Sequence, residues 1–238
     1  METFALESLR GEPQGHALSE AEAFYHNAER PVYPGRYERP LSYKQVLLDA
    51  DAFFGKVMSE QPQNLQCGRG CSLCCHGLFE IGSGDVPVLA EGLAKLHPAR
   101  RKRIVRRAQE IIDAFAHPNL RECSPEEKEE FFERTAGIPC PALSERGECE
   151  MYESRPLVCR TFGLPLREAE RYVGDICELN FTEATDEEKM RAAWDLMSED
   201  VLGPEDEYTI PEAIVLAARL LGAAEESGGA RARSPALH

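Results

Sequence analysis

The chain has 238 residues, of which 42% are apolar and 29% are charged, and its formal net charge is −15. These proportions are typical of a globular protein with one hydrophobic core. The negative charge would repel phosphate backbones and anionic lipids, so we expect no nucleic-acid partner and no membrane partner.

The two sequence signals of export or membrane insertion are not evident. The N-terminal residues lack the apolar core of a signal peptide. The apolar stretch at 213–224 is too short for a bilayer and is interrupted by Arg219. We therefore expect a cytoplasmic protein, in which glutathione and thioredoxin keep thiols reduced.

The predicted elements begin with an irregular arm, because residues 1–40 are polar and carry four prolines. Apolar residues then recur at helical spacing from Val46 to Val57, which predicts a helix from 42 to about 60. Ser124, followed by Pro125 and by Glu127 three residues on, is a strong N-terminal signal for another helix. On periodicity and capping together, we predict that this helix covers 125–137 and that others lie at 86–96, 98–117, 185–197 and 209–222.

The stretch from 138 to about 180 has a different character. It is rich in proline, glycine and cysteine and has no helical period, so we expect turns and a small hairpin. No strand–helix–strand alternation is visible anywhere. The predicted fold class is therefore mainly α. It comprises a cysteine-cluster domain at 41–222 with its motif region at 66–180, an irregular arm at 1–40 and a disordered tail at 223–238.

Two short segments hold seven of the nine cysteines. The first, CGRGCSLCC, carries Cys67, Cys71, Cys74 and Cys75, and the second carries Cys140, Cys149 and Cys159. In a reducing compartment, clustered cysteines are more often metal ligands than disulfide partners. Thiolates at these spacings can converge on one metal centre. Buried structural thiols are the less favoured alternative, because free cysteines rarely crowd in this way.

The number of cysteines bears on the kind of centre. Six or seven thiolates exceed the four ligands of a tetrahedral zinc, so a binuclear site or an iron–sulfur cluster would use them better. Cys74 and Cys75 are adjacent and their side chains diverge, so one of them could bridge to a second metal or pack in the core. Cys177 is a further candidate ligand. We interpret Cys123 as a lone thiol and His76 as a loop residue, with a nitrogen ligand as the alternative for His76.

Arginines lie beside the cysteines. We predict that Arg155 and Arg160 hydrogen-bond the thiolates or nearby carbonyls and offset their charge, and Arg69 lies inside the first segment. The alternative is that Arg155 and Arg160 are ordinary surface arginines. The basic run at 100–107 is interpreted as a solvated helix face paired with the acidic run at 126–130, with a docking site for an acidic partner as the alternative.

At these positions the chain resembles the YkgJ-type cysteine-cluster family, a zinc- or iron-chelating domain with a CxxCxxCC signature. The first family element corresponds to Cys67, Cys71, Cys74 and Cys75, here with one extra residue after Cys67. The second corresponds to Cys140, Pro141, Leu143, Cys149, Tyr152, Arg155, Pro156, Cys159, Arg160 and Phe162, and Cys177 with Asn180 resembles a downstream element. The resemblance covers about 66–180. It implies metal chelation without a defined reaction.

We therefore predict a metal-chelating protein that holds zinc or iron, with an iron–sulfur cluster as one form of the centre. One alternative is an iron–sulfur-dependent protein methyltransferase, because the family includes proteins similar to flagellin lysine N-methylases. The Cys67–Cys74 spacing also resembles that of radical S-adenosylmethionine enzymes, but Leu73 stands where an aromatic residue is usual. The other alternative is a protein-interaction module stapled by its metal. Whether the protein is an enzyme is left open, and the metal ion is the one partner predicted.

Overall fold

The computed structural model describes residues 42–68, 70–115, 118–175, 177–196 and 206–231. The predicted N-terminal arm, Arg69, Met197 and residues 232–238 of the predicted tail lie outside these ranges. The described part is mainly helical, as predicted, with two small sheets. None of its helices is both long and apolar enough to cross a membrane.

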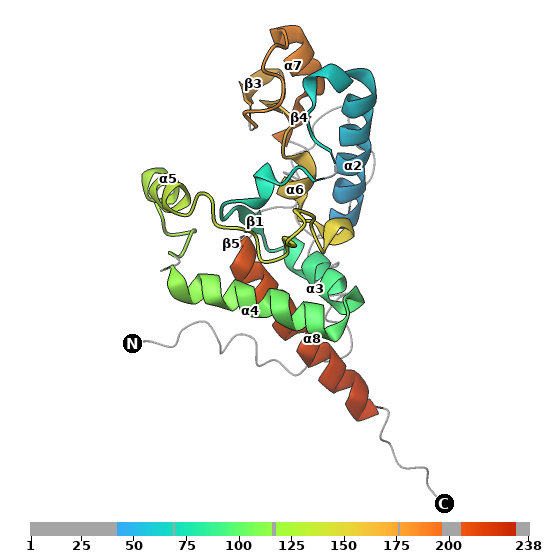
Figure 1. The fold of residues 1–238 in the computed structure, drawn as a ribbon, viewed down its shortest axis with the longest axis vertical. Coiled ribbons are helices and arrows are strands. Elements are labelled where there is room, and N and C mark those ends of the chain that lie inside the picture. Colours follow the sequence, from blue (N-terminus) through green and yellow to red (C-terminus); the bar gives the residue numbers. More distant parts are fainter. Residues whose placement is uncertain (1–41, 69, 116–117, 176, 197–205, 232–238) are drawn as a thin grey trace, which may run out of the picture.

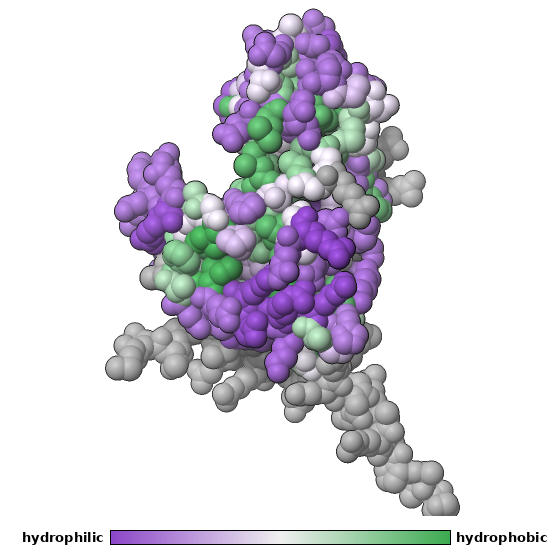
Figure 2. Space-filling model, viewed as in Figure 1, coloured by the Kyte–Doolittle hydropathy of each residue, from purple (hydrophilic) through white to green (hydrophobic). Residues whose placement is uncertain are grey.

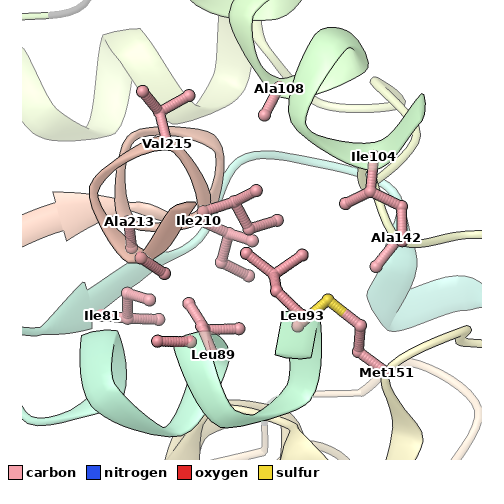
Figure 3. Packing of buried hydrophobic residues seen from close by; sticks show 13 residues of the cluster. Ile81, Leu89, Leu93, Ile104, Ala108, Ala142, Met151, Ile210, Ala213 and Val215 are labelled. Atoms are coloured by element: carbon pink, nitrogen blue, oxygen red, sulfur yellow. The ribbon is translucent and has the colours of Figure 1, made fainter. Parts of the chain in front are cut away.

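Three helices form the base of the molecule: α3 (Asp85–Lys95), α4 (Pro98–Ala114) and α8 (Ile210–Arg231). Figure 1 shows α8 crossing close to α3 and α4, and both pairs are in contact. Their inward side chains include Leu93, Ile104 and Ile214, each almost completely buried. In Figure 3, Ala142 and Met151 of the second cysteine segment join the same group. We call this group the base cluster, and it anchors the second cysteine segment.

A second hydrophobic group lies around α2 (Tyr43–Glu60) and the short helix α6 (Leu157–Thr161) in the upper part of Figure 1. The helix α2 is capped by Ser42, whose hydroxyl accepts from Gln45 N. Its predicted apolar face is confirmed. The group, called the upper cluster, comprises Tyr43, Val46, Leu47, Ala50, Val57, Leu65, Leu157, Leu164, Phe181, Ala192 and Trp194.

Two small sheets fix the loops between the helices. β1 (Glu80–Gly82) pairs antiparallel with β5 (Glu207–Thr209), so the chain leaving the first cysteine segment lies beside the start of α8. β2 (Leu166–Glu168) and β3 (Arg171–Gly174) form the predicted small hairpin, and β4 (Trp194–Asp195) adds parallel to β2.

The helix predicted at 185–197 is shorter than expected. The capping box of Thr185 and Glu188 starts α7 (Asp186–Ala192) as predicted, but Trp194 lies in β4. Its backbone N–H donates to Pro165 O at 2.8 Å, and its ring lies 5.7 Å from the ring of Phe53. Strand pairing and burial against α2 therefore outweigh the helical period that placed Trp194 in α7.

The ends of the other helices agree with the predicted ends in some cases and differ in others. α5 (Pro125–Arg134) begins with the predicted capping box at Ser124. α8 begins next to Thr209, as predicted, but continues past Gly222, where its end was expected. α6 was not predicted because five residues are too few to show a helical period. The described residues also include three short 3₁₀ turns: η1 (Pro62–Asn64), η2 (Leu73–Cys75) and η3 (Tyr152–Ser154).

A buried carboxylate joins the two clusters. Asp85, at the start of α3, is 2% exposed. It accepts hydrogen bonds from the hydroxyl of Tyr43 in α2 and from the backbone N–H of Leu157 in α6, the latter at 3.1 Å. A buried carboxylate is stable only when such donors satisfy it, so Asp85 specifies how α2, α3 and α6 meet.

The basic run lies on α4, within the hydrophilic band that crosses the lower half of Figure 2. Arg103 pairs with Glu150, and Arg107 donates to Leu143 O at 3.0 Å, so both tie α4 to the second cysteine segment. Lys128 of α5 pairs with strand residues. The ion pairs found here differ from the predicted pairing between the two charged runs, because the fold turns α4 toward the second cysteine segment.

The packing of α3 on η3 generates a stability prediction. A Cβ at buried Gly92 would lie 2.6 Å from Ser154 Cβ, whereas a Cβ at exposed Gly55 in α2 would meet no atom within 4 Å. We expect Gly92→Ala to lower the free energy of unfolding by about 1–3 kcal/mol through overpacking. The control Gly55→Ala should raise it by about 0.5–1 kcal/mol. Urea denaturation measures both, and equal effects would contradict the described packing.

Candidate metal centre

The two cysteine segments lie side by side, although more than 60 residues separate them along the chain. The backbone N–H of Cys140 donates to Cys75 O at 2.8 Å, and that of Gly77 donates to Ile138 O at 2.7 Å. His76 and Pro139 form an isolated antiparallel bridge between these bonds. The two segments therefore form one substructure near the centre of Figure 1.

All seven clustered cysteines line one cavity of about 790 Å³. Every cysteine of the chain is a free thiol in this structure, so no disulfide joins the two segments. The cavity is lined on the first segment by Cys67, Cys71, Cys74 and Cys75 and on the second by Cys140, Cys149 and Cys159. The fold thus directs the predicted ligands of both segments toward a common space.

The cavity lies between the two hydrophobic clusters. Cys140, Cys149 and Cys159 pack against the base cluster, and Cys67 packs against the upper cluster. A group bound by sulfurs from both sides would therefore connect the two clusters.

The adjacent pair Cys74 and Cys75 interacts directly. The Cys75 thiol hydrogen-bonds the Cys74 sulfur, which lowers the pKa of Cys74 to about 7 despite its partial burial. The positive charge of Arg155 acts in the same direction. The same hydrogen bond raises the pKa of Cys75 far above its ordinary value. Of this pair, Cys74 is therefore the more acidic thiol, and Cys75 donates the hydrogen bond.

Burial dominates the chemistry of the second segment. Desolvation raises the pKa of Cys140 to about 12 and raises that of Cys159 well above its ordinary value. It also raises the pKa of Cys149, against the charge of Arg155. These sulfurs are protonated at neutral pH without a metal, so a metal that binds them must displace protons.

The two arginines have different environments. Arg160 is 7% exposed and donates from Nε to Arg155 O at 2.9 Å and from Nη2 to Glu153 O at 3.0 Å, and it forms an ion pair with Asp51 of α2. Arg155 stacks on Tyr152, with Cζ 3.7 Å from the ring centroid, and reaches Asp51 at 3.3 Å. The hydrogen bonds and the ion pair of Arg160 are thus with carbonyls and a carboxylate, whereas Arg155 also influences the thiols electrostatically.

Asn180 fixes the sulfur of Cys67. Its Nδ2 donates to Cys67 Sγ at 3.2 Å and to Gly163 O at 2.9 Å, and its Oδ1 accepts from Gln66 N at 2.9 Å. Gly163 has φ +99°, and a Cβ there would lie 2.6 Å from Asn180 Nδ2 and 3.1 Å from Cys67 Sγ. Glycine is therefore required for this close approach.

The remaining candidates lie elsewhere. Cys177 is buried and close enough to Cys67 for their charges to interact, but it does not line the cavity. Cys123 donates to Asn119 O at 3.3 Å, outside the cavity. His76 Nδ1 hydrogen-bonds Ser72 O at 2.9 Å, also outside it.

Comparison with known proteins now places this substructure in a family. Residues 66–178 match the CxxCxxCC family model, described as "Putative zinc- or iron-chelating domain". This segment is a CxxCxxCC domain. The matched residues lie within the span of about 66–180 over which the sequence resembles this family. The chain matches no curated protein and no solved structure.

The residues of the CxxCxxCC domain fit zinc or iron in their chemistry, because soft thiolates select these metals. The geometry is not that of a closed cage: within the described ranges, no three or more Cys, His, Asp or Glu side chains are arranged so that they could hold one metal ion. Rotation about χ1 moves a cysteine sulfur by several ångströms without moving the backbone. Metal binding by these thiols would therefore require such side-chain rotation.

Three residues of the CxxCxxCC domain and its surroundings were missed by reasoning from sequence. Gly163 and Asp85 gave no signal, because their roles depend on contacts with distant segments. Asp51 could have been found, since Asp51, Phe54 and Met58 recur at helical spacing on one face of α2, and all three line the cavity.

The contacts of Asn180 generate a second prediction. Asn180→Ala leaves the buried Gly163 O and the partly buried Gln66 N without their partners, so we expect the free energy of unfolding to fall by about 2–3 kcal/mol. The control Asn64→Ala removes one half-buried hydrogen bond to Gln61 Oε1 and should cost about 1 kcal/mol or less. Thermal or urea denaturation of both variants measures the difference. A smaller effect for Asn180→Ala than for Asn64→Ala would contradict the described role.

Proposed function

We propose that the CxxCxxCC domain holds a polynuclear metal–thiolate centre, either two metal ions or an iron–sulfur cluster, bound by the seven clustered cysteines. One observation carries this proposal: two segments far apart in sequence direct all seven free thiols into a single cavity. Protein chains rarely bring so many unpaired thiols together unless a metal binds them.

The ligand count supports more than one metal. A tetrahedral zinc or iron takes four thiolates, and seven are available, so about two metal ions can be satisfied if one sulfur is shared. Cys74 is the sulfur best suited to sharing, because its charge acts on Cys67 of the first segment as well as on Cys140, Cys149 and Cys159 of the second. Cys177 would be an additional ligand only if its side chain turned toward the cavity.

Electrostatics also supports the proposal. Several thiolates in one cavity repel each other, and two divalent cations with the guanidinium of Arg155 would offset most of that charge. The centre, when bound, would supply Lewis acidity or, with iron, electron transfer. The chain's own residues do the rest. Asn180 orients Cys67, and backbone pairing at Cys75 and Cys140 sets the distance between the segments.

We also propose that the protein works in a reducing compartment. Nine free thiols are stable in a reducing compartment, which supports a cytoplasmic location. The methyltransferase and interaction-module alternatives remain predictions, and no contact of the described residues favours either of them.

Metal analysis tests the proposal. We expect the purified protein to contain about two metal equivalents per chain by elemental analysis. Serine at Cys67, Cys71, Cys140 and Cys149 together should remove them, because ligands are lost from both sides of the cavity. The control Cys123→Ser, outside the cavity, should retain the full content. Full metal content in the fourfold variant would overturn the proposal.

The visible spectrum of the same samples identifies the metal. An iron–sulfur centre prepared without oxygen is brown and absorbs in the visible range, whereas a zinc centre is colourless. A single metal equivalent that persists when Cys74 is changed to Ser would contradict the shared-sulfur arrangement while leaving chelation intact.

A further inference from the structure

We propose that the cysteine cavity also binds a small organic anion with an apolar body, whose anionic group pairs with Arg155 beside the metal–thiolate centre. The position next to a metal rests on the proposed function. The anion binding itself is argued from the volume of the cavity, from its lining residues and from the unpartnered Nε of Arg155.

The cavity is larger than two metal ions require. The cavity measures about 790 Å³, whereas a water molecule occupies about 30 Å³, and a bare metal ion is smaller. Binding sites for small molecules measure about 300–1,000 Å³. Two metal ions would therefore leave most of the space for another molecule.

Part of the lining is apolar and carries no metal ligands. Phe54 and Met58 of α2 line the cavity together with the cysteines, whereas Leu89, Ile210 and Ile214 are almost completely buried and contribute little surface to it. A closed structural metal site consists of its ligands and their hydrogen-bond partners. An aliphatic and aromatic wall is instead suited to the apolar body of an organic molecule.

Large, partly apolar side chains also lie where the cavity opens to solvent. Met58 is 36% exposed and Tyr152 is 56% exposed, and both line the cavity. Large apolar side chains exposed beside a concave site often mark where an organic ligand or partner makes contact. Tyr152 also covers one face of the Arg155 guanidinium, which positions that cation at the edge of the cavity.

Arg155 supplies the polar anchor. Its Nε is buried and has no hydrogen-bond partner, and it is the one buried side-chain nitrogen or oxygen in this state among the described residues. Both arginines pair with Asp51, but Arg160 also donates from Nε and Nη2 to two carbonyls. An unsatisfied buried donor costs about 1–3 kcal/mol, so a shift of the Arg155 side chain that brings Nε to an acceptor in the cavity is favourable. A carboxylate, sulfonate or phosphate oxygen is the acceptor that suits a guanidinium best.

The test uses the full-length, metal-loaded protein and 8-anilinonaphthalene-1-sulfonate, a fluorescent probe with an apolar body and one sulfonate. We expect one probe molecule per chain. Arg155→Gln should weaken its binding about tenfold or more, because a charge-assisted hydrogen bond is lost. Met58→Glu, at the exposed entrance, should also weaken it by repulsion. The matched control Lys102→Gln removes one positive charge from the groove between α4 and α8 and should leave the affinity within about twofold.

The outcomes separate this proposal from the metal proposal, because metal content is measured on the same samples. Unchanged probe affinity in both Arg155→Gln and Met58→Glu would overturn the anion site, whatever the metal content. Loss of metal in Arg155→Gln with unchanged probe binding would assign Nε to a metal-bound thiolate and would also overturn it. If Lys102→Gln weakened probe binding as much as Arg155→Gln does, the probe would lie in the α4–α8 groove. That result would also overturn the anion site.

Discussion

Two backbone hydrogen bonds on either side of the His76–Pro139 bridge hold the two cysteine segments together, and the rest of the site depends on them. Cys140 N–H to Cys75 O and Gly77 N–H to Ile138 O set the register of one segment against the other. Backbone groups removed from water must be paired, so this register is strongly specified. The thiols on both segments then face a common cavity, which neither segment could form alone.

The cavity lies where the base and upper clusters meet, and polar contacts supplement the apolar packing there. Asp85 joins α2, α3 and α6, and Asp51 holds Arg155 and Arg160 against α2. A metal bound by cysteines of both clusters would add its binding free energy to this junction, since ligands from two bodies are then fixed together. Metal binding and the packing of the two clusters would be coupled for this reason.

Local signals predicted the elements that depend on local interactions. The stripe from Val46 to Val57 and the capping boxes at Ser124 and Thr185 gave α2, α5 and the start of α7. Prediction was wrong for Trp194, where pairing with β2 and contact with Phe53 decided the conformation. A period of 3.6 residues cannot reveal a strand whose partner is almost 30 residues away, because the decisive hydrogen bonds are not local.

The sequence by itself determined the donor set: seven thiols in two segments, soft ligands whose spacing indicated a zinc or iron centre. It also identified Arg155 and Arg160 as neighbours of that centre. Only the tertiary structure distinguished them: both pair with Asp51, but the Nε of Arg160 donates to a carbonyl, whereas the Nε of Arg155 is buried without a partner. The reason is physical: residue type and spacing determine which atoms can bind, whereas burial and partners depend on chain segments that meet only in the folded state.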